Sequence, residues 1–97
     1  MEVEILDKAL QKAETEGFPG GYPADIERAY FKLLRFIRDA KDERDFYAIK
    51  SLHFEKLKGD RADERSMRLN KQWRLILKIR PGSSKATVLI CGIEDYH

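Results

Sequence analysis

Apolar side chains in the first half of the chain recur at the spacing of a helix. They fall every three or four positions, and the stripe consists of Ile26, Ala29, Tyr30, Leu33, Leu34 and Ile37. A single apolar stripe of this kind is typical of an amphipathic helix that packs on a core. Pro23 suits the first turn of such a helix, and Asp25 and Glu27 suit the positive end of its dipole. We therefore predict one long helix in this region.

The segments around this helix give shorter and weaker signals. Residues 2–6 alternate apolar and acidic side chains, which favours either an edge strand or the entry into a helix. Asp7 can cap a short helix over residues 8–16, and Gly17 is well placed to end it. Residues 42–49 form a further candidate helix.

After residue 64 the apolar period changes from that of a helix to that of a strand. Within residues 73–80 the apolar face consists of Trp73, Leu75, Leu77 and Ile79, and the opposite face carries Arg74, Lys78 and Arg80. Residues 65–70 alternate in the same way, and residues 81–84 have the composition of a hairpin loop. Residues 86–93 are nearly all apolar, as in a central strand that is covered on both faces.

Helices followed by strands predict an α+β fold, with the N-terminal helices packed on one face of a small antiparallel sheet. The length of 97 residues suits one domain, which we expect to span residues 1–97. The helices would cover one face of the sheet. The other face would then present Arg68, Arg74 and Lys78 to the outside.

The net charge of +2 hides an uneven distribution along the chain. Residues 1–49 hold 8 Lys or Arg and 11 Asp or Glu, whereas residues 50–85 hold 11 and 4, a net +7. Clustered cations favour a polyanionic partner through counterion release. A solvated lysine-rich surface is the alternative explanation of the same count.

Composition also excludes several classes of protein. Cys91 is the single cysteine, so the chain forms no intramolecular disulfide, and with only 2 histidines a structural zinc site is not expected. The chain contains no apolar run of membrane-spanning length and no signal-peptide pattern. We therefore expect a cytoplasmic protein that needs no membrane, metal or cofactor.

Two motifs carry residues suited to chemistry on RNA. Leu57-Lys-Gly-Asp-Arg61 is a basic turn in which Gly59 permits a tight bend. The predicted last strand delivers its acidic, tyrosine and histidine side chains at its end, in Gly92-Ile-Glu-Asp-Tyr-His97. Each motif alone is better explained by ordinary structure. Together they would place a tyrosine and a histidine beside a basic sheet face.

Cleavage of RNA by its own 2′-hydroxyl needs a base, cations that stabilise the phosphate, and an acid for the leaving 5′ oxygen. Lys58, Arg68 and Arg74 can supply positive charge, and an arginine can hold a phosphate through two parallel hydrogen bonds. His97 titrates in the range required of an acid or a base, and Tyr96 can donate a proton or stack on a base. Asp95 could orient His97 or Arg74.

These motifs, together with Ser66-Met-Arg-Leu-Asn70 and Gln72-Trp-Arg74, resemble the HigB-type toxins of the RelE/ParE superfamily, often named plasmid-maintenance killer proteins. The resemblance covers nearly the whole chain and implies a RelE-like microbial ribonuclease-type fold. It implies an endoribonuclease, or mRNA interferase, that cuts mRNA in the ribosomal decoding site without a metal. It also implies a helix-turn-helix antitoxin of the HigA type as partner.

The resemblance assigns roles to single residues. The catalytic residues that it implies are Lys58, Arg74, Asp95, Tyr96 and His97. Substrate contacts are expected from Arg61, Arg68, Lys78 and His53. One position departs from the pattern: some members carry a histidine three residues before the lysine, where this chain has Glu55, and His53 lies two residues further back. A histidine at the edge of the core or on a surface turn is the alternative interpretation of His53.

Two other functions remain compatible with the sequence. A toxin of the same fold could act on a protein target such as gyrase, as the ParE branch does, although that branch generally lacks the tyrosine and histidine at its end. A catalytically inactive RNA-binding module is the second alternative. Lys58, Arg74 and His97 argue against it.

Overall fold

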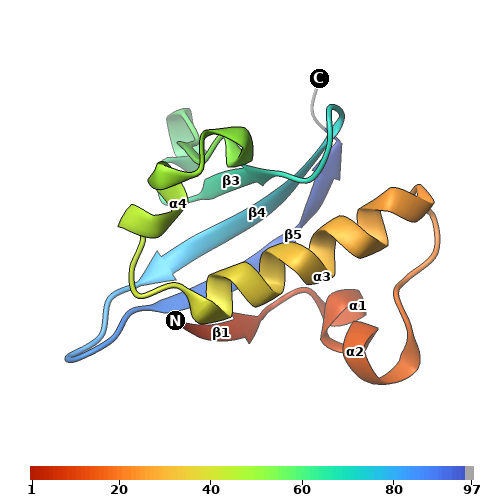
Figure 1. The fold of residues 1–97 in the computed structure, drawn as a ribbon, viewed down its shortest axis with the longest axis horizontal. Helices are drawn as coiled ribbons and strands as arrows, with labels where there is room; N and C mark the ends of the chain where they lie inside the picture. The colour runs from red at the N-terminus through yellow and green to blue at the C-terminus, as the bar shows by residue number, and fades with distance from the viewer. Residues whose placement is uncertain (96–97) are drawn as a thin grey trace.

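The computed structural model describes residues 1–95, and the predictions for Tyr96 and His97 therefore lie outside the described residues. Five strands form one sheet in the order β1-β5-β4-β3-β2 (Figure 1). Their bounds are Glu2–Ile5 for β1, Glu55–Lys56 for β2, Arg65–Arg68 for β3, Trp73–Arg80 for β4 and Thr87–Asp95 for β5. The strict alternation in residues 73–80 thus predicted β4 with its correct bounds.

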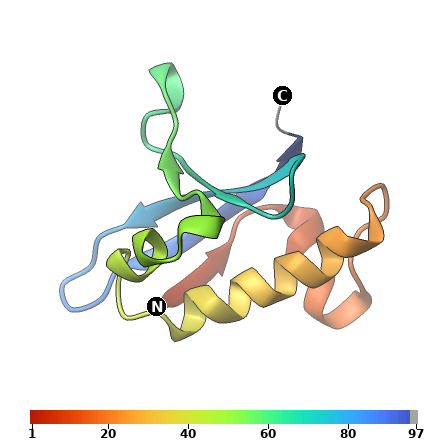
Figure 2. The ribbon, with the colours of Figure 1, turned by 45° about the horizontal axis from the view of Figure 1, so that its top comes forward.

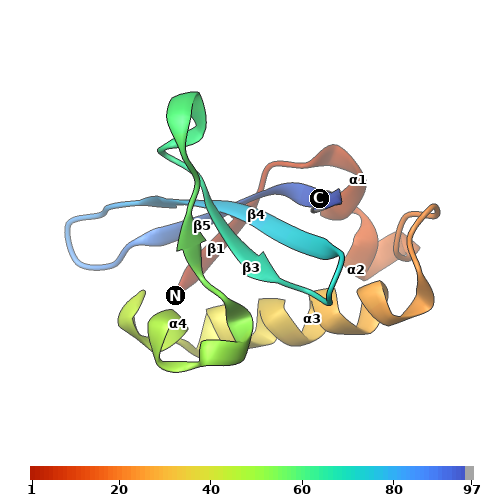
Figure 3. The same ribbon diagram turned by 90° about the horizontal axis from the view of Figure 1, so that it is seen from above.

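The predicted long helix is α3, Ala24–Asp39, which lies along one face of the sheet (Figures 1 and 3). The shorter helices are α1 (Lys8–Gln11), α2 (Ala13–Glu16) and α4 (Arg44–Ala48), with the 3₁₀ turns η1 (Lys50–Leu52) and η2 (Gly59–Arg61). Asp7 caps α1 by accepting a hydrogen bond from the Leu10 amide at 3.0 Å. The helix predicted over residues 8–16 is therefore present in two pieces that meet at Lys12.

The core lies between α3 and the sheet. Five residues of the α3 stripe are buried, namely Ile26, Tyr30, Leu33, Leu34 and Ile37. They face a layer of buried strand residues that includes Met67, Leu75, Leu77, Val88 and Ile90. Full burial of one such aliphatic side chain stabilises a fold by about 1.5–3 kcal/mol. This packing fixes which face of the sheet is closed.

The α+β class is confirmed, but the sheet is mixed rather than purely antiparallel. Residues 2–5 form β1, which runs parallel to β5 with Val3 opposite Val88. A parallel pair needs a long crossover, and here the chain between the two strands contains all the helices and the other strands. The alternation in residues 2–6 is therefore explained by a strand, not by the entry into a helix.

Strand β5 also differs from its prediction as a strand covered on both faces. Val88 and Ile90 are buried, whereas Thr87 and Leu89 are only half-buried, because α3 covers one face alone. The ladder with β4 shifts register between Ile76 and Leu77, which lie opposite Gly92 and Ile90. Cys91 is the extra residue of this bulge, and such bulges bend a strand and increase its twist.

Candidate functional site

A short arm rises from the sheet on the side opposite α3. It consists of β2 and η2 and is drawn in green in Figures 2 and 3. Two ladder pairs attach it to β3, Glu55 opposite Ser66 and Lys56 opposite Arg65. Gly59 has φ +68°, a backbone conformation that glycine adopts without strain, and it allows the arm to turn back. The arm forms one wall above the otherwise open face.

A cleft of about 250 Å³ lies between this arm and the ends of β3, β4 and β5. Its lining consists of Glu55, Leu57, Arg61, Ser66, Arg74, Ile76, Glu94 and Asp95. Three predicted site residues, Arg61, Arg74 and Asp95, therefore meet in one place. The cleft is somewhat smaller than a site for a drug-sized ligand, and its size suits part of an extended chain.

Arg74 forms the floor of the cleft. It lies on the predicted face of the sheet, but it is only 8% exposed and so is not presented to the outside as expected. Its Nη2 donates to Ser66 Oγ at 3.1 Å and to the His53 carbonyl oxygen at 3.4 Å, and a Glu55 carboxylate oxygen lies 3.5 Å away. These partners offset the cost of burying a cation. The sequence pattern missed the burial because β2 and the turn before it fold over this face.

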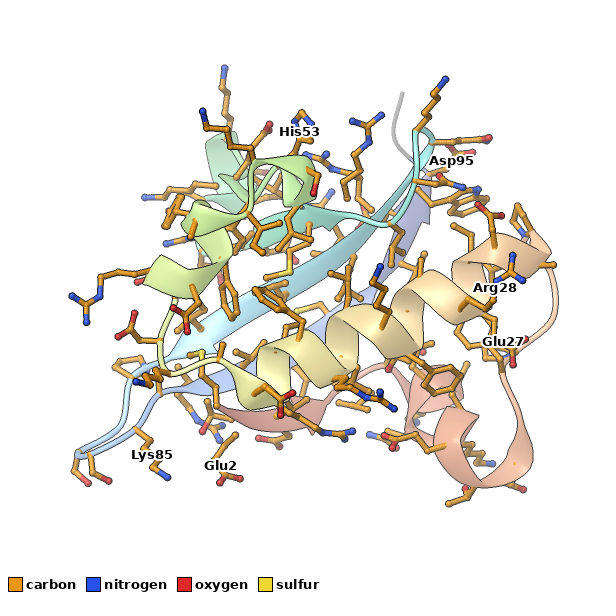
Figure 4. The ribbon with its side chains drawn as sticks, in the orientation of Figure 1. Glu2, Glu27, Arg28, His53, Lys85 and Asp95 are labelled. Atoms are coloured by element: carbon orange, nitrogen blue, oxygen red, sulfur yellow. The ribbon has the colours of Figure 1, made fainter. Side chains whose placement is uncertain are left out.

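His53 lies beside the floor of the cleft, at the end of η1. Its φ of 48° and ψ of 50° place it in the left-handed region, which is uncommon for a residue other than glycine and costs of order 1–3 kcal/mol. Its Nε2 lies 3.1 Å from Nη1 of Arg68, so a neutral ring can accept a hydrogen bond from that guanidinium. Figure 4 labels His53 and Asp95, which lie toward the same edge of the molecule.

Arg61 and Glu94 form a bridge across the cleft from η2 to β5. Two parallel hydrogen bonds join them, Nη1 to Oε1 at 2.9 Å and Nη2 to Oε2 at 2.6 Å. Glu64 also accepts a hydrogen bond from Nε of the same arginine. Both carboxylates, Glu94 more than Glu64, raise the pKa of the Arg61 guanidinium above its already high ordinary value. The cation is thus held on the cleft wall, and it is engaged by carboxylates.

Lys58 and Lys78 lie outside the lining of the cleft. Lys58 is the exposed residue that precedes η2, next to the lining residue Leu57. Lys78 lies 3.1 Å from a carboxylate oxygen of Asp63, and that hydrogen bond raises the pKa of Lys78 and lowers the pKa of Asp63. Neither lysine is therefore among the described residues that line the cleft.

Carboxylates neutralise part of the predicted basic face. Arg74 has Glu55, Arg61 has Glu94, and Lys78 has Asp63 as ion-pair partners. The net +7 of residues 50–85 therefore overstates the positive potential of this surface, since Glu94 comes from outside that block. A phosphate that binds here has to displace or share these carboxylates.

Asp95 completes the far end of the cleft. It lies opposite Trp73 in the β4–β5 ladder, and its Oδ2 accepts a hydrogen bond from Gln72 Nε2 at 3.1 Å. The chain continues from this point to Tyr96 and His97, whose predicted roles lie outside the described residues.

Sequence reasoning missed Ser66, Glu94 and Glu55 as lining residues. Ser66 could have been found, because strand alternation places it on the same face as Arg68. Glu55 was noted only as a departure from a motif. Its position beside Arg74 depends on the pairing of β2 with β3, which no local pattern encodes.

Over residues 1–95 no group of three or more histidine, cysteine, aspartate or glutamate side chains is arranged to hold a metal ion. Within the same residues no helix is both long and apolar enough to cross a membrane.

Comparison with known proteins relates the whole chain to one family. The sequence model of HigB-like toxins, described as RelE-like toxins of the type II toxin–antitoxin system HigB, matches residues 4–96. None of the curated proteins compared with the chain matches it. A solved structure titled "YoeB/ParE toxin from Agrobacterium tumefaciens" superposes with a TM-score of 0.62 over 100% of both chains at 16% identity, which shows a shared fold. The chain therefore belongs to the HigB-like toxins, a RelE-like family whose type II systems pair each toxin with an antitoxin.

Proposed function

We propose that this toxin is an endoribonuclease that cuts mRNA on the ribosome and that the cleft beneath η2 is its active site. The observation that supports the proposal best is the floor of the cleft, where the buried guanidinium of Arg74 lies between a hydroxyl and a carboxylate. A fixed cation beside a proton acceptor is what cleavage by a 2′-hydroxyl requires. Membership in the HigB-like family supports the same reaction class.

The proposed reaction needs a base, an acid and cations, and side chains can supply all three. The 2′ oxygen forms a bond to phosphorus, its proton passes to a base, and the bond from phosphorus to the 5′ oxygen breaks. The 5′ oxygen takes a proton from an acid, and the other product carries a 2′,3′-cyclic phosphate. Arg74 stabilises the crowded phosphate, with Lys58, Arg61, Arg68 and Lys78 along the path of the RNA.

Two groups are candidates for the proton transfers. Glu55, whose carboxylate lies 3.5 Å from Arg74, can take the 2′ proton because an ionised carboxylate only accepts hydrogen bonds. His97 was predicted as an acid or a base, and with Glu55 as the base we assign it the role of acid, assisted by Tyr96 and oriented by Asp95. His53, whose Nε2 lies 3.1 Å from Nη1 of Arg68, is assigned a contact with the RNA and not the role of the base.

The ribosome supplies what the free protein lacks. Among residues 1–95 the lining of the cleft contains no aromatic side chain on which a base could stack. Its cations are engaged by carboxylates, which weakens attraction for free RNA. A ribosome that holds the message in place removes much of the orientation cost. The partners are then ribosome-bound mRNA and a HigA-type helix-turn-helix antitoxin, in the cytoplasm.

The test compares ribosome-bound with naked mRNA. The purified toxin should cut the mRNA on programmed ribosomes, leave a cyclic phosphate end, and cut naked RNA far more slowly, and the slow cleavage of naked RNA should be the same with and without EDTA. Arg74→Ala should abolish this cleavage. Arg80→Ala is its matched control and should cut normally, because Arg80 lies on the same strand, β4, but outside the cleft, where it pairs with Glu4. Equal cleavage of naked RNA would contradict the ribosome requirement. Growth arrest with intact mRNA and blocked DNA supercoiling would favour action on gyrase instead.

A further inference from the structure

Two polar side chains in the lining of the cleft are buried, and they contact each other. Ser66 is 2% exposed and Arg74 is 8% exposed. Burial of a hydroxyl costs free energy unless a hydrogen bond compensates for it. The bond that compensates here is the one from Arg74 Nη2 to Ser66 Oγ, at 3.1 Å. The buried serine is therefore tied to the one cation that the proposed reaction places at the phosphate.

The register of the sheet explains why Arg74 needs such a partner. In the β3–β4 ladder Arg74 lies directly opposite Arg68, and Ser66 lies opposite Ile76. Like charges that face each other across two strands repel, whereas a long side chain can reach the diagonal neighbour. Arg74 extends diagonally to Ser66, and Arg68 turns away to the backbone carbonyl of Asn70, which accepts from its Nε at 3.2 Å. Ser66 thus gives the guanidinium of Arg74 its direction.

Ser66 is also the most firmly held of the three groups around Nη2. It lies on β3, which is paired on both sides, with β2 and with β4. The His53 carbonyl oxygen is 3.4 Å from Nη2, longer than an ordinary hydrogen bond. The Glu55 carboxylate is 3.5 Å away, and its side chain is 56% exposed. The short bond to a paired strand therefore orients the guanidinium more than the two longer contacts do.

We propose that Ser66 is a positioning residue for RNA cleavage, and that it holds the Arg74 guanidinium in the orientation that the phosphate of the transition state requires. This inference rests on the proposed function. In that function Glu55 takes the 2′ proton and becomes neutral, so its attraction for Arg74 is lost during the reaction. Ser66 has no charge to lose and keeps its hydrogen bond. The cation then stays in place while negative charge develops on the phosphate.

The expected effect lies in the rate of cleavage and not in the binding of mRNA. Misplacement of a catalytic group by about 1 Å costs roughly 10²-fold in rate. Loss of the Ser66 hydroxyl should therefore lower kcat by about 10–100-fold. KM should stay unchanged, because the hydroxyl acts on an interaction that is made in the transition state.

The experiment measures kcat and KM on programmed ribosomes for Ser66→Thr and Ser66→Val. Threonine and valine have the same shape and differ in the hydroxyl, so any strain from the added methyl group is common to both. Ser66→Thr should cut nearly as fast as wild type, and Ser66→Val should lose the 10–100-fold stated above. Ser66→Ala, which adds no volume, decides the question even if Ser66→Val fails to fold. Ser83→Ala removes a hydroxyl from the exposed hairpin loop and should cut normally.

A double-mutant cycle separates positioning of Arg74 from general support of the fold. In the Arg74→Met protein, Ser66→Ala should cause no further loss of cleavage, because the hydroxyl acts through the guanidinium that is already absent. A serine with a purely structural role would lower cleavage by the same factor in both backgrounds. Circular dichroism confirms that each variant is folded.

Equal kcat in Ser66→Thr and Ser66→Val would overturn the proposal, and so would an additive loss in the double mutant. If the wild-type toxin cuts no mRNA, the proposed function fails, and nuclear magnetic resonance then tests the position of Arg74 without any cleavage. Separate ¹⁵N signals for Nη1 and Nη2 of Arg74 should appear in wild type and in Ser66→Thr, because the hydrogen bond slows rotation of the guanidinium. In Ser66→Val the two nitrogens should exchange faster. Equal exchange in all three proteins would show that Ser66 does not hold Arg74.

Discussion

Replacement of Arg74 separates its role in folding from its role in chemistry. In Arg74→Ala the buried Ser66 hydroxyl loses its 3.1 Å partner, which costs about 1–3 kcal/mol, and the truncated side chain leaves a void. Glu55 loses less, because its side chain is 56% exposed. Removal of a buried cation partly compensates. We expect a net loss of about 1–3 kcal/mol, or roughly 4–8 °C in Tm for each kcal/mol in a domain of this size.

Arg74→Met is the matched variant, because methionine fills most of the same volume without a charge. Methionine removes the void but not the loss of the hydrogen bond to Ser66, so part of the destabilisation of Arg74→Ala should remain. We therefore expect a smaller loss of stability than in Arg74→Ala, with cleavage reduced about 10²–10³-fold, the cost of losing a donor to a developing charge. Thermal denaturation by circular dichroism and cleavage on programmed ribosomes measure the two effects. A folded Arg74→Met that still cuts mRNA, or one as unstable as Arg74→Ala, would refute this reasoning.

Three further predictions concern other parts of the molecule. Glu94→Gln should release Arg61 from its bidentate pair and tighten binding of a short RNA in a fluorescence titration. The stability should change by under about 1 kcal/mol, because both side chains are nearly half exposed. Unchanged RNA affinity would show that Glu94 does not compete with phosphate for Arg61. Deletion of Tyr96 and His97 should lower activity about 10²–10⁴-fold and leave the circular dichroism spectrum unchanged, and full toxicity of the folded truncation would exclude them from catalysis. Burial raises the pKa of Tyr30 to about 12, so its contribution to stability is complete below pH 10 and is lost as the pH rises toward 12. In an absorbance titration one tyrosine should therefore ionise after the others. Simultaneous ionisation of all tyrosines in the folded protein would contradict the burial of Tyr30.

The helical and strand periods predicted the elements that build the core. The stripe from Ile26 to Ile37 repeats over three turns, and residues 73–80 alternate without a break. Each pattern is therefore compatible with only one type of secondary structure. Residues 2–6 are too few for such a decision. Their parallel pairing with β5 depends on a partner more than 80 positions away, which a local pattern cannot specify.

The candidate site was predictable in its residue types and not in its geometry. Alternation correctly placed Arg68 and Arg74 on one face, because they lie opposite each other in the β3–β4 ladder. The burial of Arg74 was not predictable, since it depends on the two-residue strand β2 and on the His53 carbonyl. The bridge between Arg61 and Glu94 joins residues 33 positions apart, and nothing near either residue indicates the other.

The arm that carries Glu55 and Arg61 is attached to the sheet by two ladder pairs and by the ion pairs of these two residues with Arg74 and Glu94, whereas β4 and β5 share eight ladder pairs. It should therefore open locally at a much smaller free energy than the core needs to unfold. Lys56, Lys58 and Arg61 are exposed on this arm, so a trypsin-like protease meets three cleavable bonds there before it meets the core. One cut would separate the two walls of the cleft and leave α3 packed on its sheet. A cell could in this way disarm the toxin by proteolysis without having to unfold it.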